Sequence, residues 1–261
     1  MRLTLRAYQI AAYYASFAVF ALMALALNCL CMLFGSFVKP AVREPLTQRL
    51  VHRAFMIFVR WLSLAGIVPV RYEGFERWPK SRGLVVAANH PGLVDVGWLL
   101  ARLPEAVCVT KPDVRQNPLY GATARCAGYL YSDRGLQLLR SAAEKIARGQ
   151  TLLVFPEGTR SREGTLNPLK PGFVAVARIA RAPIQLVRIT CDSALLTKER
   201  PWWVVPHLPA TVTVALGPCL EPPGRDTDGV VDRIEAWFEQ GETPVAARPP
   251  RTGSVQLPVH T

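Results

Sequence analysis

A histidine and an aspartate lie five residues apart at the end of an apolar run, in the segment Val85–Asp95 (VVAANHPGLVD). The apolar run predicts a buried strand, and Pro91-Gly92 predicts a turn directly after it. Ligands of open α/β sheets bind beyond the carboxyl ends of the strands, which is where His90 would lie. A carboxylate at Asp95 could hold the imidazole in one tautomer, so the pair is a candidate general base with its orienting acid. The alternative is a helix-capping aspartate beside an ordinary turn histidine.

A base of this kind needs a nucleophile, and the chain offers no evident one. The sequence contains no G-x-S-x-G motif, in which a strained turn exposes a nucleophilic serine. We therefore expect the nucleophile to be a hydroxyl group of the substrate. A hydrolase that uses Cys108 or Cys126 with His90 is the alternative, although neither cysteine has an evident activating neighbour.

Arginines follow two further apolar stretches. The segment LLVFPEGTRSREG (152–164) exposes Glu157, Gly158, Thr159 and Arg160 after a predicted strand, and GYLYSDR (128–134) ends in Arg134. A glycine lets backbone N–H groups approach an anion, and an arginine fork suits a phosphate. Taken singly, each arginine could be a solvated surface charge. Together with His90, they predict an anion-binding site beside a base.

The elements that would position these residues alternate along the chain. Apolar runs predict strands at 83–89, 106–110, 151–155, 183–189 and 211–217. Helical patterns fall at 94–103, 136–149, 172–181 and 229–240. Strands that alternate with helices imply an α/β fold, with a mostly parallel central sheet covered by helices.

Four blocks of this sequence resemble those of the glycerolipid acyltransferases of the lysophosphatidate acyltransferase type. The block HPGLVD (90–95) has the family's histidine, four residues and aspartate, and FPEGTRS (155–161) matches the third block outright. GYLYSDR and APIQLVRI (182–189) are similar to the second and fourth. Lysines at 111 and 170 stand where the family usually carries one. The resemblance covers roughly residues 71–222.

The resemblance implies a specific reaction. His90, oriented by Asp95, would deprotonate the acceptor hydroxyl as it attacks an acyl thioester, and backbone N–H groups or Lys111 would stabilise the oxyanion. The other predicted substrate-binding residues, which would hold the acceptor's polar head, are Arg134, Glu157, Gly158, Thr159 and Arg160. It implies no metal and no organic cofactor, with acyl-CoA or acyl-carrier protein as co-substrate.

Departures from the family pattern leave the acceptor open. Pro91 and Gly92 stand where many members have Gln and Ser, and the segment 195–209 (LLTKERPWWVVPHLP) is similar to a branch found with aryl-polyene or other specialised lipid pathways. Lysophosphatidate, which would be converted to phosphatidate, is the first candidate. A lyso-aminolipid of the ornithine type, another lysophospholipid or an aryl-polyene lipid is the alternative. A non-catalytic lipid-binding protein is an alternative from another class.

The N-terminus predicts membrane association. No charged residue occurs between Arg6 and Lys39, which is long enough for a tilted span or a re-entrant hairpin and too long for the core of a signal peptide. A second apolar stretch, 54–68, is interrupted by Arg60 and predicts a helix in the membrane interface, with a core helix as the alternative. The basic residues after the first run outnumber those before it, which favours a catalytic part on the cytoplasmic side of a bacterial inner membrane.

Composition limits the remaining choices. The 261 residues carry 31 Lys+Arg against 19 Asp+Glu, for a net charge of +12. With an apolar N-terminus and no nucleic-acid motif, this charge favours anionic membrane lipids as partners over nucleic acid. The six cysteines have no metal-binding or disulfide spacing, so we expect reduced thiols. We expect an anchor with an interfacial helix over 1–70, a catalytic domain over 71–240, and a disordered proline-rich tail over 241–261.

Overall fold

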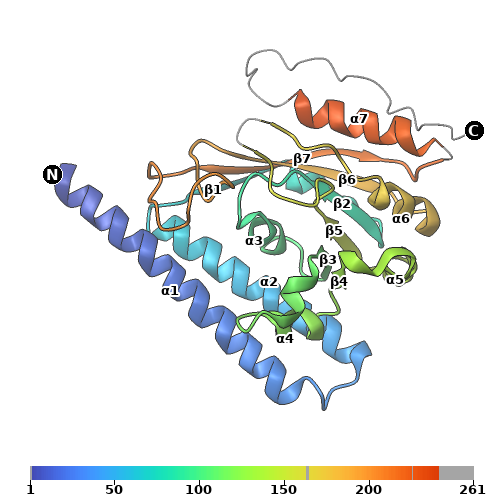
Figure 1. Cartoon of the computed structure of the whole chain (residues 1–261), viewed down its shortest axis with the longest axis horizontal. Helices are drawn as coiled ribbons and strands as arrows, with labels where there is room; N and C mark the ends of the chain where they lie inside the picture. The colour runs from blue at the N-terminus through green and yellow to red at the C-terminus, as the bar shows by residue number, and fades with distance from the viewer. Residues whose placement is uncertain (1, 163–164, 225, 241–261) are drawn as a thin grey trace, which may run out of the picture.

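A seven-stranded, mostly parallel sheet forms the centre of the molecule, in the order β1-β7-β6-β2-β5-β3-β4 (Figure 1). This computed structural model describes residues 2–162, 165–224 and 226–240. The strands are β1 (Val70–Glu73), β2 (Leu84–Ala88), β3 (Ala106–Thr110), β4 (Leu130–Tyr131), β5 (Thr151–Val154), β6 (Ile184–Cys191) and β7 (Val212–Leu220). Only the β6–β7 pair is antiparallel among the strand pairs of the described residues. The predicted fold class is confirmed.

The five predicted strands are all present as β2, β3, β5, β6 and β7. The four predicted helices are α3 (Asp95–Leu100), α5 (Gly135–Ala147), α6 (Gly172–Ala180) and α7 (Thr227–Glu239). The short elements β1, β4 and α4 (Gly121–Cys126) were not predicted. Neither were the 3₁₀ turns η1 (Phe75–Arg77), η2 (Pro112–Gln116) and η3 (Ser132–Arg134). The tail over 241–261 lies outside the described residues.

Alternate side chains of the central strand β2 enter two different cores. Val86 and Ala88 pack with α2 and α3 on one face of the sheet, whereas Val85 and Ala87 pack with α5, α6 and α7 on the other. All five β2 residues are buried, because the strand has a neighbour on each side and helices on both faces. The sheet therefore holds the end of β2, and the histidine after it, at a rigid position.

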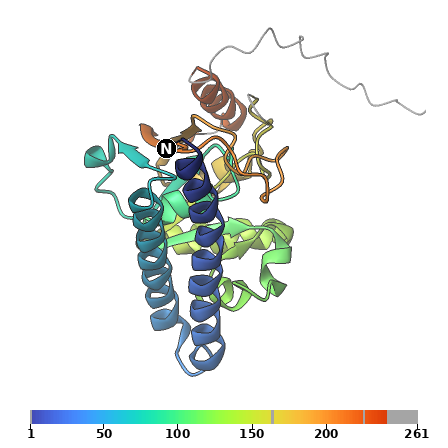
Figure 2. The same cartoon turned by 90° about the vertical axis from the view of Figure 1, so that its left-hand side faces the viewer.

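The apolar N-terminus folds into two antiparallel helices that lie side by side, α1 (Arg2–Phe34) and α2 (Pro40–Leu64) (Figure 2). Within the described residues, only the segment Leu3–Phe34 of α1 is long and apolar enough to span a membrane, and 6% of its most apolar stretch is buried. The first apolar run is thus one continuous helix, and the hairpin turn comes after it.

Both ends of α1 contact the globular part of the chain. Gln9 donates to the carbonyl oxygen of Leu208 at 3.0 Å, near the helix start. Near its end, the side-chain oxygen of Asn28 accepts from the backbone N–H groups of Ala122 and Thr123 at 2.8 and 3.1 Å. The helix therefore lies along the globular part over most of its length.

The second apolar stretch, predicted over 54–68, belongs to α2, which begins earlier and has two different faces. Phe58, Val59 and Leu62 are buried against the sheet, whereas Ile57 and Trp61 are exposed. The buried face is that of a core helix, whereas contact of the exposed apolar face with a membrane interface remains a prediction.

Candidate active site

The side chain of Asn89 fixes the point where β2 ends. Its amide nitrogen donates to the carbonyl oxygen of Ile189 at 2.9 Å, and its oxygen accepts from the Ile189 N–H at 2.7 Å. This pair of bonds imitates one further step of the β2–β6 ladder. The chain is therefore held by β6 immediately before it turns at His90.

The imidazole of His90 is bonded to the carboxylate of Asp95, as the sequence predicted. The distance from Nδ1 to Oδ2 is 2.9 Å, and the same oxygen accepts from the Gly92 N–H at 2.6 Å. An ionised carboxylate can only accept, so Nδ1 carries the hydrogen and Nε2 keeps its lone pair. The ring stacks on Phe155, with centroids 4.3 Å apart, and 19% of the His90 side chain is exposed. A positioned base with a free Nε2 can accept a proton from a hydroxyl.

Asp95 lies at the start of α3 and is almost fully buried, with 4% of its side chain exposed. Burial raises the pKa of the Asp95 carboxyl, and the hydrogen bonds from His90 and Gly92 partly offset this effect. Keeping the carboxylate ionised therefore depends on those two donors.

Glu157 has a role that the sequence did not indicate. Its carboxylate accepts four hydrogen bonds from the protein, from His90 N, Ser161 Oγ and the backbone and side-chain nitrogens of Asn167, at 2.8 to 2.9 Å. Ser161 N in turn donates to the carbonyl oxygen of His90 at 2.7 Å. Both backbone groups of His90 are therefore bound to the loop after β5. This geometry makes Glu157 a positioning residue, whereas the predicted contact between Glu157 and an acceptor remains a prediction.

Gly158 and Arg160 belong to the same loop. Gly158 has φ +69°, and a Cβ at this position would lie 2.7 Å from Nζ of Lys170, so the glycine and the ammonium group are in close contact. Arg160 donates to the carbonyl oxygens of Leu196 and Thr197 at 3.0 and 3.1 Å. Thr159 between them is half-buried.

Lys111 and Arg134 lie at the carboxyl ends of strands, as His90 does, but these strands are further across the sheet. Lys111 follows β3 and Arg134 follows β4, and the order β2-β5-β3-β4 places these ends two and three strands from that of His90. With about 4.8 Å between strands, the separations of the strand axes are roughly 10 and 14 Å. Both side chains are exposed, and Arg134 donates to Gln137. The predicted cations thus form a row along one edge rather than a single cluster.

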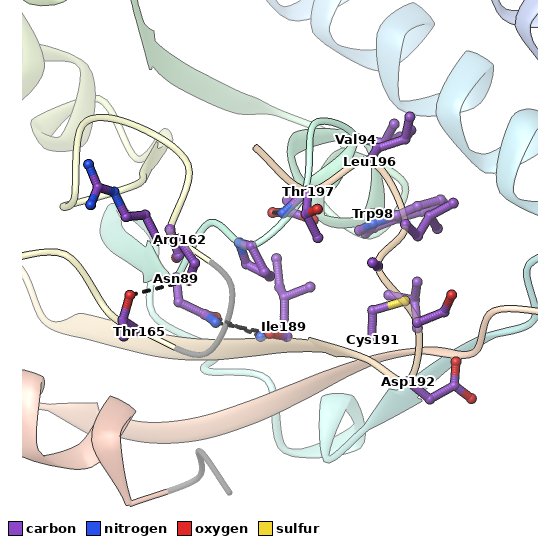
Figure 3. A pocket seen from close by; sticks show the side chains of 18 residues that line it. Asn89, Val94, Trp98, Arg162, Thr165, Ile189, Cys191, Asp192, Leu196 and Thr197 are labelled. Atoms are coloured by element: carbon purple, nitrogen blue, oxygen red, sulfur yellow. Dashed lines mark hydrogen bonds between the residues drawn. The ribbon is translucent and has the colours of Figure 1, made fainter. Parts of the chain in front are cut away.

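A cavity of about 310 Å³ lies on the Asp95 side of the site (Figure 3). It is bounded by the turn after His90, the end of β6 and the segment after it; Asn89, Asp95, Trp98, Arg162, Cys191 and Thr197 are among its lining residues. Asn89, Asp95 and Arg162 give it polar walls, and Trp98 and Ile189 give it apolar ones. Lys111 and Arg134 do not line it.

Neither cysteine of the hydrolase alternative, Cys108 or Cys126, has a hydrogen bond to His90 in the described residues. Cys108 is buried in the core, and burial raises the pKa of its thiol to about 12, so it stays protonated at neutral pH. The Cys126 sulfur lies 3.6 Å from the carbonyl oxygen of Cys31 in α1. The hydrolase alternative therefore has no activated thiol in the described structure. No group of three or more His, Cys, Asp or Glu with a metal-binding arrangement occurs in the described residues.

Comparisons with known proteins point to a single family. The family model described as Acyltransferase matches residues 69–190. A 1-acyl-sn-glycerol-3-phosphate acyltransferase of Limnanthes douglasii is 31% identical over 179 residues, which are 66% of this chain and 60% of that protein. A lyso-ornithine lipid O-acyltransferase of Pseudomonas aeruginosa is 32% identical over 151 residues, 56% of this chain and 55% of that one. The chain thus spans less than two thirds of either relative.

The crystal structure of the 1-acyl-sn-glycerophosphate acyltransferase PlsC from Thermotoga maritima has the same fold. It superimposes with a TM-score of 0.68 at 23% identity, covering 92% of this chain and 96% of that one. The likeness includes the N-terminal helices as well as the sheet, since nearly the whole of both chains is matched.

Proposed function

Because this chain belongs to the glycerolipid acyltransferase family, we propose that it transfers a fatty acyl group from an acyl thioester to the hydroxyl of lysophosphatidate, giving phosphatidate. The observation that carries the proposal is the bond between His90 Nδ1 and Asp95 Oδ2, which leaves Nε2 free at the carboxyl end of β2. A base without a protein nucleophile beside it suits transfer to a substrate hydroxyl.

The reaction needs one proton to move twice. Nε2 of His90 takes the proton of the acceptor hydroxyl as that oxygen attacks the thioester carbonyl carbon. The resulting imidazolium is stabilised by the Asp95 carboxylate. When the tetrahedral intermediate collapses, the C–S bond breaks and the imidazolium returns the proton to the leaving thiolate. Backbone N–H groups would stabilise the oxyanion, because Lys111 follows a strand two positions away from β2.

The cations along the sheet edge support an anionic acceptor and an anionic donor. The ammonium group of Lys170 lies beside Gly158, and the Lys170 N–H donates to the carbonyl oxygen of Pro156 at 2.9 Å. Arg160 belongs to the same loop as Glu157, which binds the His90 backbone, so Lys170 and Arg160 would hold the acceptor's phosphate. Lys111 and Arg134 follow strands further across the sheet and would bind the phosphates of acyl-CoA or the acidic surface of acyl-carrier protein. In this proposal Arg134 holds the donor, and not the acceptor's polar head as expected from the sequence. No metal or organic cofactor takes part in this scheme.

We further propose that the protein is bound to one face of a bacterial inner membrane, with the active site on the cytoplasmic side. The apolar α1 supports membrane association. Because α1 contacts the globular part at both ends, it would lie in one leaflet instead of crossing the bilayer. The acyl chains of both substrates would then enter from the membrane side.

A second acceptor is favoured by one observation, the similarity to a lyso-ornithine lipid O-acyltransferase. The test offers radiolabelled acyl-CoA and acyl-carrier protein to the detergent-purified protein, with lysophosphatidate or lyso-ornithine lipid as acceptor and His90→Ala beside the native chain. We expect label in phosphatidate with the native protein alone. Label only in ornithine lipid would assign the second acceptor. No transfer to either lipid by folded protein would exclude both.

A further inference from the structure

The connection between β6 and β7 carries exposed aromatic side chains. This segment, residues 193–209, is called the tryptophan loop below. Trp202 is 50% exposed, Trp203 58% and Val204 41%. The ends of the loop are closed by a hydrogen bond from Ser193 Oγ to the His207 carbonyl oxygen at 2.9 Å. The closed loop therefore presents two indoles to the outside.

On one side, the tryptophan loop is attached to α1 (Figure 1). The hydroxyls of Tyr13 and Tyr14 donate to the carbonyl oxygens of Trp202 and Trp203 at 2.7 and 2.8 Å, and the ring of Phe17 packs against Trp202 with centroids 5.2 Å apart. The loop therefore continues the exposed apolar surface of α1, on which Ile10 and Tyr14 also lie.

On its other side, the loop contacts the catalytic turn. Leu93 N, three residues after His90, donates to the carbonyl oxygen of Leu196 at 3.1 Å, and Arg160 binds the carbonyl oxygens of Leu196 and Thr197. The loop is thus a rigid bridge between the apolar helix and the site.

Cations stand next to the tryptophans. A cavity of about 300 Å³ under the loop is lined by Leu93, Arg160, Leu196, Lys198, Glu199, Arg200, Pro201, Trp202 and Trp203. Lys198 and Arg200 are exposed, and no ion pair of either is found in the described residues. Indole rings favour the membrane interface, where their apolar body meets lipid and their N–H stays wet. Lysine and arginine at that depth face the phosphates of anionic lipids.

We propose that the tryptophan loop is a second contact with the membrane, in which Trp202 and Trp203 enter the interface and Lys198 and Arg200 bind anionic lipid headgroups. This inference rests on the proposed membrane association of α1. A bilayer is the occupant that fits, because the loop extends an apolar helix surface and adds positive charge to it. The contact fixes the turn that carries His90 at the level of the headgroups.

Quenching of tryptophan fluorescence by brominated lipids tests the position of the indoles. The starting variant is Trp61→Phe, which removes the exposed tryptophan of α2. In vesicles of brominated phosphatidylcholine with phosphatidylglycerol, we expect strong quenching that is mostly abolished when Trp202→Phe and Trp203→Phe are added. Trp237→Phe, a change on the opposite face of the sheet, is the matched control and should keep the quenching.

Removal of the cations tests the headgroup contact. With Lys198→Ala and Arg200→Ala, we expect the vesicle concentration for half-maximal binding to rise roughly 30-fold on anionic vesicles at low salt, and little on neutral vesicles or at 1 M salt. Transfer to a short-chain, water-soluble acceptor in detergent should be unchanged.

Three results would overturn the proposal. The first is quenching that survives removal of both loop tryptophans, and the second is a binding defect that is equal on neutral and anionic vesicles. The third is a fluorescence change on adding acyl-carrier protein but not vesicles, which would favour a protein partner. Neither binding assay needs catalysis, so a failure of the proposed acyl transfer would be seen separately.

Discussion

The backbone nitrogen of His90 donates to Oε1 of Glu157 at 2.9 Å, and this bond joins the two sequence blocks that carry the site. Ser161 adds the reciprocal bond from its own N–H to the His90 carbonyl oxygen. The imidazole is therefore oriented at two levels, with Asp95 holding the ring and the Glu157 loop holding the main chain beneath it.

Replacement of the Glu157 carboxylate should impair His90 as a base, although Glu157 contacts only the backbone of His90. Each carboxylate oxygen of Glu157 accepts two hydrogen bonds. In Glu157→Gln an N–H₂ group replaces one of these oxygens, so the two donors that faced it no longer have an acceptor. We expect unfolding to become easier by about 1–3 kcal/mol. The kcat for acyl transfer should fall more than the acceptor KM rises. Urea unfolding and steady-state kinetics on the same preparation measure both.

Ser161→Ala is the matched control for this change. It removes a single donor to the Glu157 carboxylate, and the backbone bonds to His90 stay in place. The expected decrease in stability is about 0.5–1.5 kcal/mol, with a smaller effect on kcat. If Glu157→Gln raised KM alone, Glu157 would be an acceptor ligand instead of a positioning residue.

Replacement of Asp95 should make the folded chain more stable at neutral pH and lower its activity. Its carboxyl pKa is raised in the folded state, so the folded chain binds more protons than the unfolded chain as this group titrates. The contribution of the Asp95 carboxyl to the free energy of unfolding is therefore greatest below the ordinary aspartate pKa. It declines as the pH rises through the raised pKa of the folded state. Asp95→Asn removes the buried charge and should abolish this decline.

The measurement for Asp95→Asn is the difference in unfolding free energy between variant and native protein across that pH range, which isolates the group from others that titrate. Activity should fall about 10³- to 10⁴-fold, because an amide does not stabilise the imidazolium. A difference that does not change with pH would mean that burial does not destabilise the Asp95 carboxylate.

Much of this arrangement could be predicted from the sequence, for physical reasons. Strand β2 is buried on both faces and is apolar throughout, so its end, and with it the position of His90, could be predicted from the apolar run. In contrast, the short strand β1 reads VRYE, with alternating exposed residues and no long apolar run. The two-residue β4 and six-residue α4 are too short for any periodic pattern.

The internal partners of the site were not predictable in the same way. Glu157 looks like a loop acid, and acids in loops are ordinarily solvated. Its burial depends on Asn167, ten residues later, whose position comes only from how the loop folds. The side chain of Asn89 likewise binds β6 a hundred residues away, and nothing in its local pattern indicates this bond.

The thiols should be dispensable. Because burial raises the Cys108 pKa to about 12, we expect no labelling of Cys108 by a maleimide in the folded protein, and full acyl transfer after the exposed Cys219 has reacted. Mass spectrometry of peptides reports which thiols react. Inactivation in proportion to Cys108 labelling would instead support a cysteine nucleophile.

A methyl group at Gly158 should reach Lys170. The new Cβ of Gly158→Ala would lie 2.7 Å from Nζ of Lys170, and the φ of +69° is strained for any L-residue other than glycine. The strain costs about 1–2 kcal/mol and the ammonium group must move away. We expect the acceptor KM to rise about 10-fold while kcat changes less, since an ammonium group that has moved would bind the acceptor's phosphate more weakly by about 1.4 kcal/mol.

Gly172→Ala is the matched control, because nothing lies within 4 Å of its Cβ and its φ is not positive. Equal effects of the two changes on KM would remove Lys170 from the acceptor site.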